Sequence, residues 1–170
     1  MDRRPFYPGG EGWQGAALHM RLQARHGKPA MRCVVFDLDG TLADTSADLL
    51  AAANASLPQP VLHAGDALTA FHGGRAMLRL GFERLGMTWS ETDVDAAYPV
   101  LLEAYRQGIA VHTRLYPGAI AAVEALKSQG FAVSICTNKP EGLAEELLRQ
   151  LGVREAFAAL VGADTLPVRK

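Results

Sequence analysis

A short apolar run over residues 33–36 (Cys-Val-Val-Phe) leads directly into Asp-Leu-Asp-Gly at residues 37–40. An apolar run that ends at an Asp-Gly turn is typical of a buried strand. Side chains two apart in an extended segment point the same way, so Asp37 and Asp39 are predicted to lie side by side. In open α/β sheets, ligands bind at the carboxyl ends of the strands. The junction therefore predicts a site at the end of this strand.

Two adjacent carboxylates suit group transfer, because their repulsion favours one ionised and one protonated group. An ionised Asp37 can attack phosphorus and form an aspartyl-phosphate. Asp39 can then give a proton to the leaving oxygen and later take one from water. Gly40 permits a sharp turn whose amides can approach a phosphate. A calcium loop is disfavoured, since its sixth and twelfth positions hold Leu42 and Asp48 instead of Gly and Glu.

Residues 34–44 resemble the first motif of the haloacid dehalogenase superfamily, an apolar strand followed by Asp-x-Asp-Gly-Thr-Leu-x-Asp. Members with a second Asp two residues after the nucleophile are phosphatases and phosphomutases. The resemblance therefore implies phosphoryl chemistry, with Asp37 as nucleophile and Asp39 as acid/base. It also implies Mg²⁺ as cofactor, held through these two residues, and phosphate contacts from Gly40 and Thr41.

A second β-rich run over residues 131–136 stops at Thr137-Asn138-Lys139. This strand is expected beside the first, where the Thr137 hydroxyl and the following amides could hold phosphate oxygens. A strand followed by Thr or Ser and then Asn is also the superfamily's second motif. Lys170 resembles the lysine of the third motif, which neutralises charge between nucleophile and phosphate, and its other interpretation is a solvated chain end.

The remaining pattern alternates helices and strands. Helical spacing is found over residues 47–105 in several segments, and no strand pattern occurs between Asp44 and Tyr116. A helix after Gly118, the strand at 131–136, a helix over 141–151 and a strand at 158–161 follow. This order predicts an α/β fold: a Rossmann-like parallel sheet with a small all-helical cap inserted after the first strand.

The expected domain boundaries follow from this order. The core is predicted over residues 31–46 and 113–170, and the helical cap over residues 47–112. Residues 1–30 contain three prolines, several glycines and four arginines without any sustained period. They are predicted to be a disordered N-terminal extension.

The superfamily's fourth motif, an acidic pair that supplies further magnesium ligands, has no counterpart in this sequence. The chain is therefore predicted to be truncated before that motif. Asp164 is a conceivable substitute ligand, although it follows a different strand. In relatives a fourth strand pairs with the first, so its absence predicts an open sheet edge and self-association through it.

Residues 71–75 and 116–118 are most similar to phosphoglycolate phosphatase-like members of the superfamily. This similarity implies a small phosphorylated metabolite as substrate, best 2-phosphoglycolate, with Arg75 binding its carboxylate as a bidentate donor. Two alternatives stay open: a phosphomutase on the same scaffold, and an inactive fragment that serves as an interaction module.

Composition limits the partners. The net charge of −1 gives no reason to expect nucleic acid or a membrane surface as a partner. No apolar stretch is long enough to cross a bilayer. The two cysteines, Cys33 and Cys136, lie in expected core strands and are predicted to be buried free thiols, which favours the cytoplasm.

Overall fold

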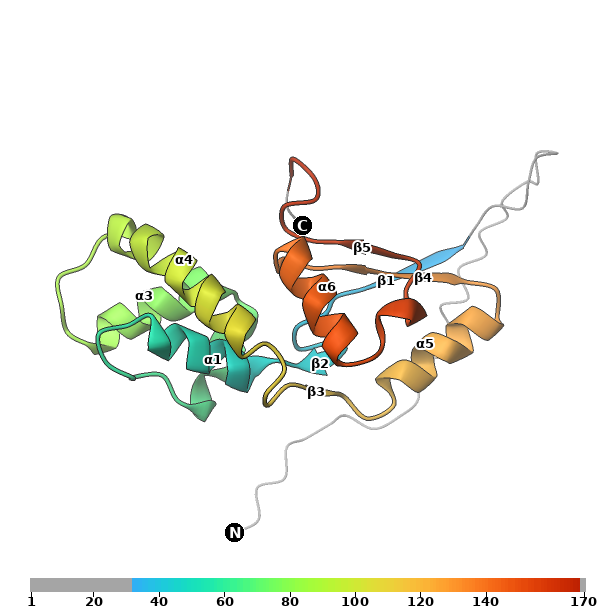
Figure 1. Ribbon diagram of the computed structural model, residues 1–170, viewed down its shortest axis with the longest axis horizontal. Helices are drawn as coiled ribbons and strands as arrows, with labels where there is room; N and C mark the ends of the chain where they lie inside the picture. The colour runs from blue at the N-terminus through green and yellow to red at the C-terminus, as the bar shows by residue number, and fades with distance from the viewer. Residues whose placement is uncertain (1–31, 169–170) are drawn as a thin grey trace, which may run out of the picture. The chain divides into compact units, whose positions relative to one another are not determined.

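The structure is a computed structural model that describes residues 32–168. The expected extension over residues 1–30 and the candidate Lys170 lie outside these residues. A parallel sheet of three strands runs in the order β1 (Cys33–Phe36), β4 (Ala132–Cys136) and β5 (Ala159–Val161). Figure 1 shows this sheet on the right and the helices α1, α3 and α4 on the left. The α/β fold with a helical insert is confirmed.

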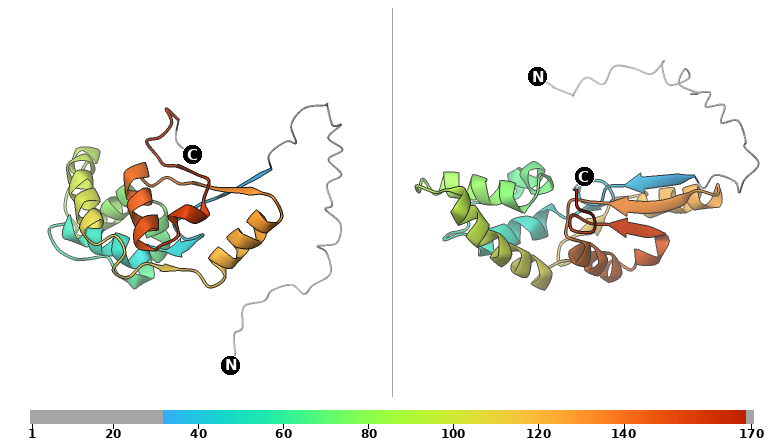
Figure 2. Two further views of the ribbon diagram at one scale, coloured as in Figure 1. Left: turned by 45° about the vertical axis from the view of Figure 1, so that its right-hand side comes forward. Right: turned by 90° about the horizontal axis from the view of Figure 1, so that it is seen from above.

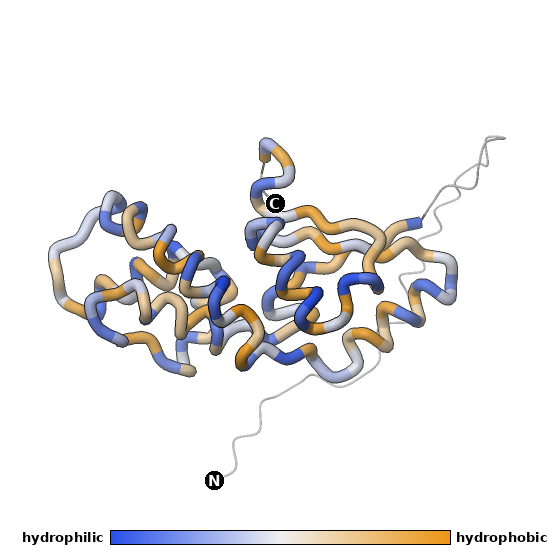
Figure 3. The backbone as a smooth tube through the Cα atoms, viewed as in Figure 1, coloured by the Kyte–Doolittle hydropathy of each residue, from blue (hydrophilic) through white to orange (hydrophobic). Residues whose placement is uncertain are grey.

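Two helices cover one face of the sheet. In the views of Figures 1 and 2, α5 (Ala119–Ser128) and α6 (Glu141–Gln150) lie on the same side of the three strands. This placement follows from topology, since both crossovers move one strand in the same direction and right-handed connections are the rule. Val133, Ile135 and Leu160 are buried in this region. Figure 3 shows the strands as mainly apolar segments, in contrast to the alternating helices.

Strand β1 lies at the edge of the described sheet, paired with β4 alone. Val35 is 57% exposed. The prediction that the Cys33 thiol is buried is wrong: the side chain is exposed because the strand that carries it is outermost, while Cys136 is half-buried. Self-association through this edge stays a prediction.

The insert consists of α1 (Ser46–Ala55), α2 (Ala67–Phe71), α3 (Gly74–Arg84) and α4 (Glu91–Gln107). The expected capping box opens α4, where the Ser90 amide donates to Asp93 Oδ2 at 2.7 Å. Short 3₁₀ turns occur at Ala64–Asp66 and Arg154–Ala156. No helix among residues 32–168 is both long and apolar enough to cross a membrane. The insert is held together by an apolar interior that includes Leu49, Met77, Leu78, Val94, Leu101 and Tyr105.

The two connections between sheet and insert are joined to each other. β2 (Ala43–Asp44) pairs antiparallel with β3 (Arg114–Leu115). The prediction that no strand lies between Asp44 and Tyr116 is therefore wrong for β3, because two residues are too short to show a period. The residue boundaries given above for core and cap stay a prediction.

A buried carboxylate strengthens this junction. Asp48, in the first turn of α1, is only 4% exposed. Its oxygens accept hydrogen bonds from the amides of His112 and Thr113 at 2.8–3.0 Å and from the Thr113 hydroxyl at 2.8 Å. A buried charge is tolerated when several donors surround it. The start and the end of the insert are therefore tied at one point.

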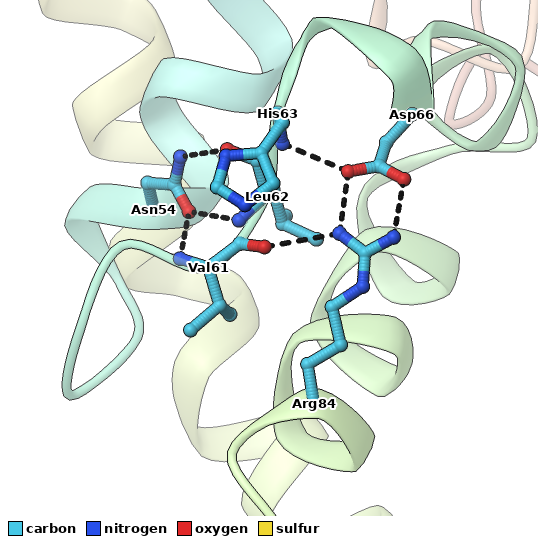
Figure 4. A network of polar contacts seen from close by, with 6 residues as sticks. All are labelled: Asn54, Val61, Leu62, His63, Asp66 and Arg84. Atoms are coloured by element: carbon cyan, nitrogen blue, oxygen red, sulfur yellow. Dashed lines mark hydrogen bonds and ion pairs between the residues drawn. The ribbon is translucent and has the colours of Figure 1, made fainter.

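A second polar network holds the loop that follows α1 (Figure 4). The Asn54 amide group donates to the Leu62 carbonyl at 2.9 Å and accepts from the amides of Val61 and Leu62 at 3.0 Å. Arg84 donates to the Val61 carbonyl at 3.0 Å and, through two nitrogens, to both oxygens of Asp66 at 2.6 Å. These contacts fix residues 56–63, which have no regular secondary structure, and the 3₁₀ turn at Ala64–Asp66 that follows them.

We expect Asn54→Ala to destabilise the chain, because it leaves two backbone amides and a carbonyl without their partner. The free energy of unfolding should fall by about 1–3 kcal/mol. Gln107→Ala is the matched control, since among the described residues this exposed side chain makes one hydrogen bond, to Glu103. Urea unfolding of the three proteins measures the difference, and equal midpoints for the two variants would contradict this role.

Acid should weaken the Arg84–Asp66 contact. Hydrogen bonds from Arg84, and then from the His63 amide, lower the pKa of Asp66 from 3.8 to about 2. Because the folded-state pKa is depressed, the stabilisation is complete above 3.8 and is lost as the pH falls towards 2. Thermal unfolding of the wild type and Asp66→Asn should therefore differ at about pH 7 and converge only below about pH 2. A difference that persists in acid would assign the effect to another group.

Candidate active site

The turn after β1 is built on one carbonyl group. The Leu38 carbonyl accepts hydrogen bonds from the amides of Thr41, Leu42 and Ala43 at 3.0–3.2 Å. The Leu38 side chain is fully buried, and its amide donates to Asp37 Oδ1 at 2.8 Å. An apolar anchor inside the turn thus fixes both acidic residues that flank it.

Gly40 allows this turn to pass under the insert. Its φ is +74°, in the left-handed region that favours glycine. A Cβ at this position would lie 3.1 Å from the ring of Phe71 in α2. The glycine is therefore required both by the backbone conformation and by the close approach of an insert side chain.

Asp39 is held from two directions. The Thr45 hydroxyl donates to Asp39 Oδ1 at 2.6 Å, and Lys139 Nζ lies 3.1 Å from the same oxygen. The Asp39 side chain is 15% exposed. Thr45 occupies the N-cap position of α1 but makes no cap hydrogen bond, because its hydroxyl donates to Asp39 instead.

The end of β4 contributes a second polar group beside the turn. Thr137 is 2% exposed, and its hydroxyl accepts a hydrogen bond from the Lys139 amide at 3.1 Å. The Thr137 amide donates to Val161 of β5 at 2.9 Å, which fixes the segment to the sheet. Asn138, between Thr137 and Lys139 in the sequence, is exposed.

Lys139 joins the site to the insert. Its ammonium group donates to the Tyr105 hydroxyl of α4 at 3.0 Å and lies 4.2 Å from the centroid of the Tyr105 ring. Burial disfavours the charged form, but Asp39 and Tyr105 more than offset this cost, so the pKa of Lys139 is raised. Burial likewise raises the pKa of Tyr105. The ammonium group therefore carries its charge at neutral pH.

These groups surround a pocket of about 300 Å³. Its polar lining includes Asp37, Asp39 and residues 137–139. The lining residues of the insert are mainly apolar apart from His72, and they include Leu49, Ala70, Phe71, Tyr98, Leu101, Leu102 and Tyr105. A small anionic molecule can bind here with its charged group beside the two carboxylates only if cations neutralise the negative charges of the carboxylates.

The structure brings together some of the expected site residues and not others. Asp37, Asp39, Thr137 and Asn138 all line the pocket. Gly40 and Thr41 belong to the turn but do not line it. Lys170 lies outside the described residues.

Arg75 and Asp164 are engaged elsewhere. Arg75 forms an ion pair with Asp95 on the insert surface, its guanidinium stacks on Tyr98, and it is absent from the pocket lining. Asp164 accepts a hydrogen bond from the Glu141 amide at 2.7 Å, at the start of α6, and does not line the pocket either. The geometry therefore gives no support to carboxylate binding by Arg75 or to metal binding by Asp164.

The Lys139 side chain is the group that sequence reasoning missed. Only its amide was expected to take part. One signal was present: a lysine at the third position after a buried strand, at the edge where ligands bind, has few routes to solvent. Its partner Tyr105 lay hidden within an apolar helical face.

Residues 31–170 match the haloacid dehalogenase-like hydrolase family. The chain belongs to this family. It is 37% identical over 149 residues to a phosphoglycolate phosphatase of Agrobacterium fabrum, and 37% identical over 141 residues to one of Mesorhizobium japonicum. These matches cover 84% and 81% of this chain but 63% and 62% of the relatives, so the chain spans less than two thirds of their length.

Solved structures agree on the fold of this haloacid dehalogenase-like chain. One described as a predicted phosphoglycolate phosphatase from Haemophilus somnus superimposes with a TM-score of 0.70 at 24% identity, covering 85% of this chain and 68% of that one. Another, a phosphatase from Lactobacillus delbrueckii described as putative, gives 0.69 at 21% identity and covers 82% and 66%. At these identities the likeness concerns the fold alone.

We expect Gly40→Ala to be more destabilising than Gly130→Ala. Both glycines have a left-handed φ, which costs a residue with a Cβ about 1–2 kcal/mol. Only at Gly40 would the new methyl group press on another side chain, and overpacking adds about 1–3 kcal/mol. Chemical unfolding compares the variants, and equal losses would show that Phe71 moves aside freely.

Proposed function

We propose that this haloacid dehalogenase-like chain is a Mg²⁺-dependent phosphomonoesterase that acts on 2-phosphoglycolate through an aspartyl-phosphate at Asp37. The observation that carries the proposal is that Asp37 and Asp39 line one small pocket together with residues 137–139 and with mainly apolar residues of the insert. The phosphoglycolate phosphatases at 37% identity support the choice of substrate.

The reaction is proposed in two steps. An oxygen of Asp37 attacks phosphorus, the bond from phosphorus to the ester oxygen breaks, and Asp39 gives its proton to that oxygen, which releases glycolate. Water then attacks the phosphorus of the aspartyl-phosphate while Asp39 takes a proton from it. The bond between phosphorus and Asp37 breaks, which restores the carboxylate and releases phosphate.

Asp39 is well placed for the proton transfers. The Thr45 hydroxyl and Lys139 Nζ both contact Oδ1. The carboxylate is thereby oriented by groups from α1 and from the end of β4. A fixed orientation is what a general acid needs in order to meet the leaving oxygen.

The donor set at the turn suits a hard cation. Mg²⁺ prefers oxygen ligands and commonly takes one or two carboxylates together with water and substrate phosphate. Asp37 would supply a carboxylate oxygen and Asp39 its backbone carbonyl oxygen, although no cluster of three potential metal-binding side chains occurs among residues 32–168. When bound, the ion would offset the negative charge that gathers at the phosphate.

A second candidate is a binding module without turnover. It is favoured by the small set of potential metal ligands within the described part of the chain. The two candidates differ in their products, since only the enzyme releases inorganic phosphate. A phosphomutase would instead isomerise a sugar phosphate with no net release.

Phosphate release from 2-phosphoglycolate tests the proposal. With Mg²⁺ we expect the wild type to release phosphate. In Asp37→Asn the turnover rate should fall by about a thousandfold, because an amide is a far weaker nucleophile than a carboxylate. Asp95→Asn is the matched control, as this exposed carboxylate on α4 lies outside the pocket lining. EDTA should abolish release from the wild type. Equal rates in wild type and Asp37→Asn would contradict the mechanism, and no release from a folded wild type would favour the binding module.

A further inference from the structure

We propose that Lys139, held in place by Tyr105, is the specificity-determining residue of this site and recognises a second negative charge on the substrate, beyond its phosphate. The inference deepens the proposed function and rests on it. It assigns to the Lys139 ammonium the contact with a carboxylate tail that sequence reasoning gave to Arg75.

The first argument is the position of the charge. Lys139 lines the pocket, and its side chain is only 4% exposed. Among the described lining residues it is the sole lysine or arginine, and the neighbouring lining side chains of the insert are mostly apolar. An anionic tail that enters the pocket therefore meets one permanent cation in the described part of the chain.

The second argument is the geometry of the ammonium group. An ammonium has three N–H donors and no acceptor. The described residues supply two polar partners, Asp39 Oδ1 at 3.1 Å and Tyr105 Oη at 3.0 Å. The third donor is thus available to a ligand. Because Tyr105 also presents its ring 4.2 Å from Nζ, the long lysine side chain is fixed before a ligand arrives.

The third argument is the exclusion of the competing cation. Arg75 is 40% exposed, pairs with Asp95 and stacks on Tyr98 at 4.7 Å from the ring centroid. It would have to break both contacts to reach a ligand. Lys139 needs no such rearrangement. It lies two residues from Thr137, whose backbone is fixed to β5, so its own backbone position is set by the sheet.

This assignment identifies the substrate class by charge. A suitable substrate is a small phosphate ester whose other end carries a carboxylate or a second anion a few bonds away. Esters with neutral tails fill the same space but leave the third donor of Lys139 unpaired in a buried site. Since unpaired buried donors are costly, such esters should bind more weakly.

The experiment compares two esters of nearly equal shape, 2-phosphoglycolate and its neutral amide, 2-phosphoglycolamide. Binding of each to the Asp37→Asn chain is measured by titration calorimetry with Mg²⁺ present, so that no turnover is needed. We expect the carboxylate ester to bind about ten- to a hundredfold more tightly, the range of a charge-assisted hydrogen bond. In Asp37→Asn/Lys139→Met the ratio of the two affinities should fall to about one, because the loss of the ammonium weakens binding of 2-phosphoglycolate more than binding of 2-phosphoglycolamide.

Two further variants keep the test informative. Asp37→Asn/Tyr105→Phe retains the ring but loses the hydroxyl that orients Lys139, so the preference should shrink without vanishing. Asp37→Asn/Arg79→Met is the matched control, since Arg79 is an exposed cation of α3 that pairs with Glu91. Circular dichroism and thermal unfolding establish whether each variant is folded. If the Lys139 variant is not folded, the preference measured for the Tyr105 variant provides the test.

Several results would overturn the inference. These are equal binding of the two esters by Asp37→Asn, binding of neither ester, an equal loss for both esters in the Lys139 variant, or a loss of preference in Asp37→Asn/Arg75→Met alone. An equal loss would instead assign Lys139 to the phosphate itself. The proposed function fails separately, by the absence of phosphate release from the wild type, so the two failures are distinguishable.

Discussion

The parallel pairing of β1 with β4 is the constraint on which the site depends. Phe36 lies opposite Ile135 in the register, so the segments that follow the two strands emerge at the same edge of the sheet. This pairing brings the acidic turn after residue 36 beside Thr137 and Lys139, although about a hundred residues separate them in the chain. The intervening helical insert does not disturb the pairing, because its two connections are joined through β2, β3 and Asp48.

The burial of the Lys139 ammonium group determines which side chains must lie beside it. An ammonium as enclosed as that of Lys139 requires a carboxylate and further hydrogen bonds, and Asp39 and Tyr105 provide them. The same contacts also fix the position of Asp39. Asp39 receives its two side-chain partners from the N-cap of α1 and from the segment after β4, so the residue proposed as acid and base is oriented from both sides. Through Tyr105 the insert is part of the same network.

Much of this could be predicted from sequence. The strand at residues 33–36, the adjacent second strand and the helical insert carry strong local patterns: an apolar run with an Asp-Gly turn, a β-rich run, and repeated helical spacing. Asp37, Asp39 and Thr137 follow from strand ends alone. The patterns failed for Cys33, which lies on an edge strand and is exposed. The surface contact of Arg75 with Asp95 depends on packing between elements and could not be read from them.

The Lys139–Tyr105 contact shows why the remaining part was hidden. Tyr105 belongs to an apolar face of α4, and its hydroxyl gains a polar role only because the helix end meets the end of β4. Tyr105 lies close in sequence to the return connection that begins at His112, whereas Tyr98 lies seven residues earlier, about 10 Å farther along the helix. The hydroxyl that holds Lys139 therefore comes from the last turn of α4, at the end of the helix nearest the return connection.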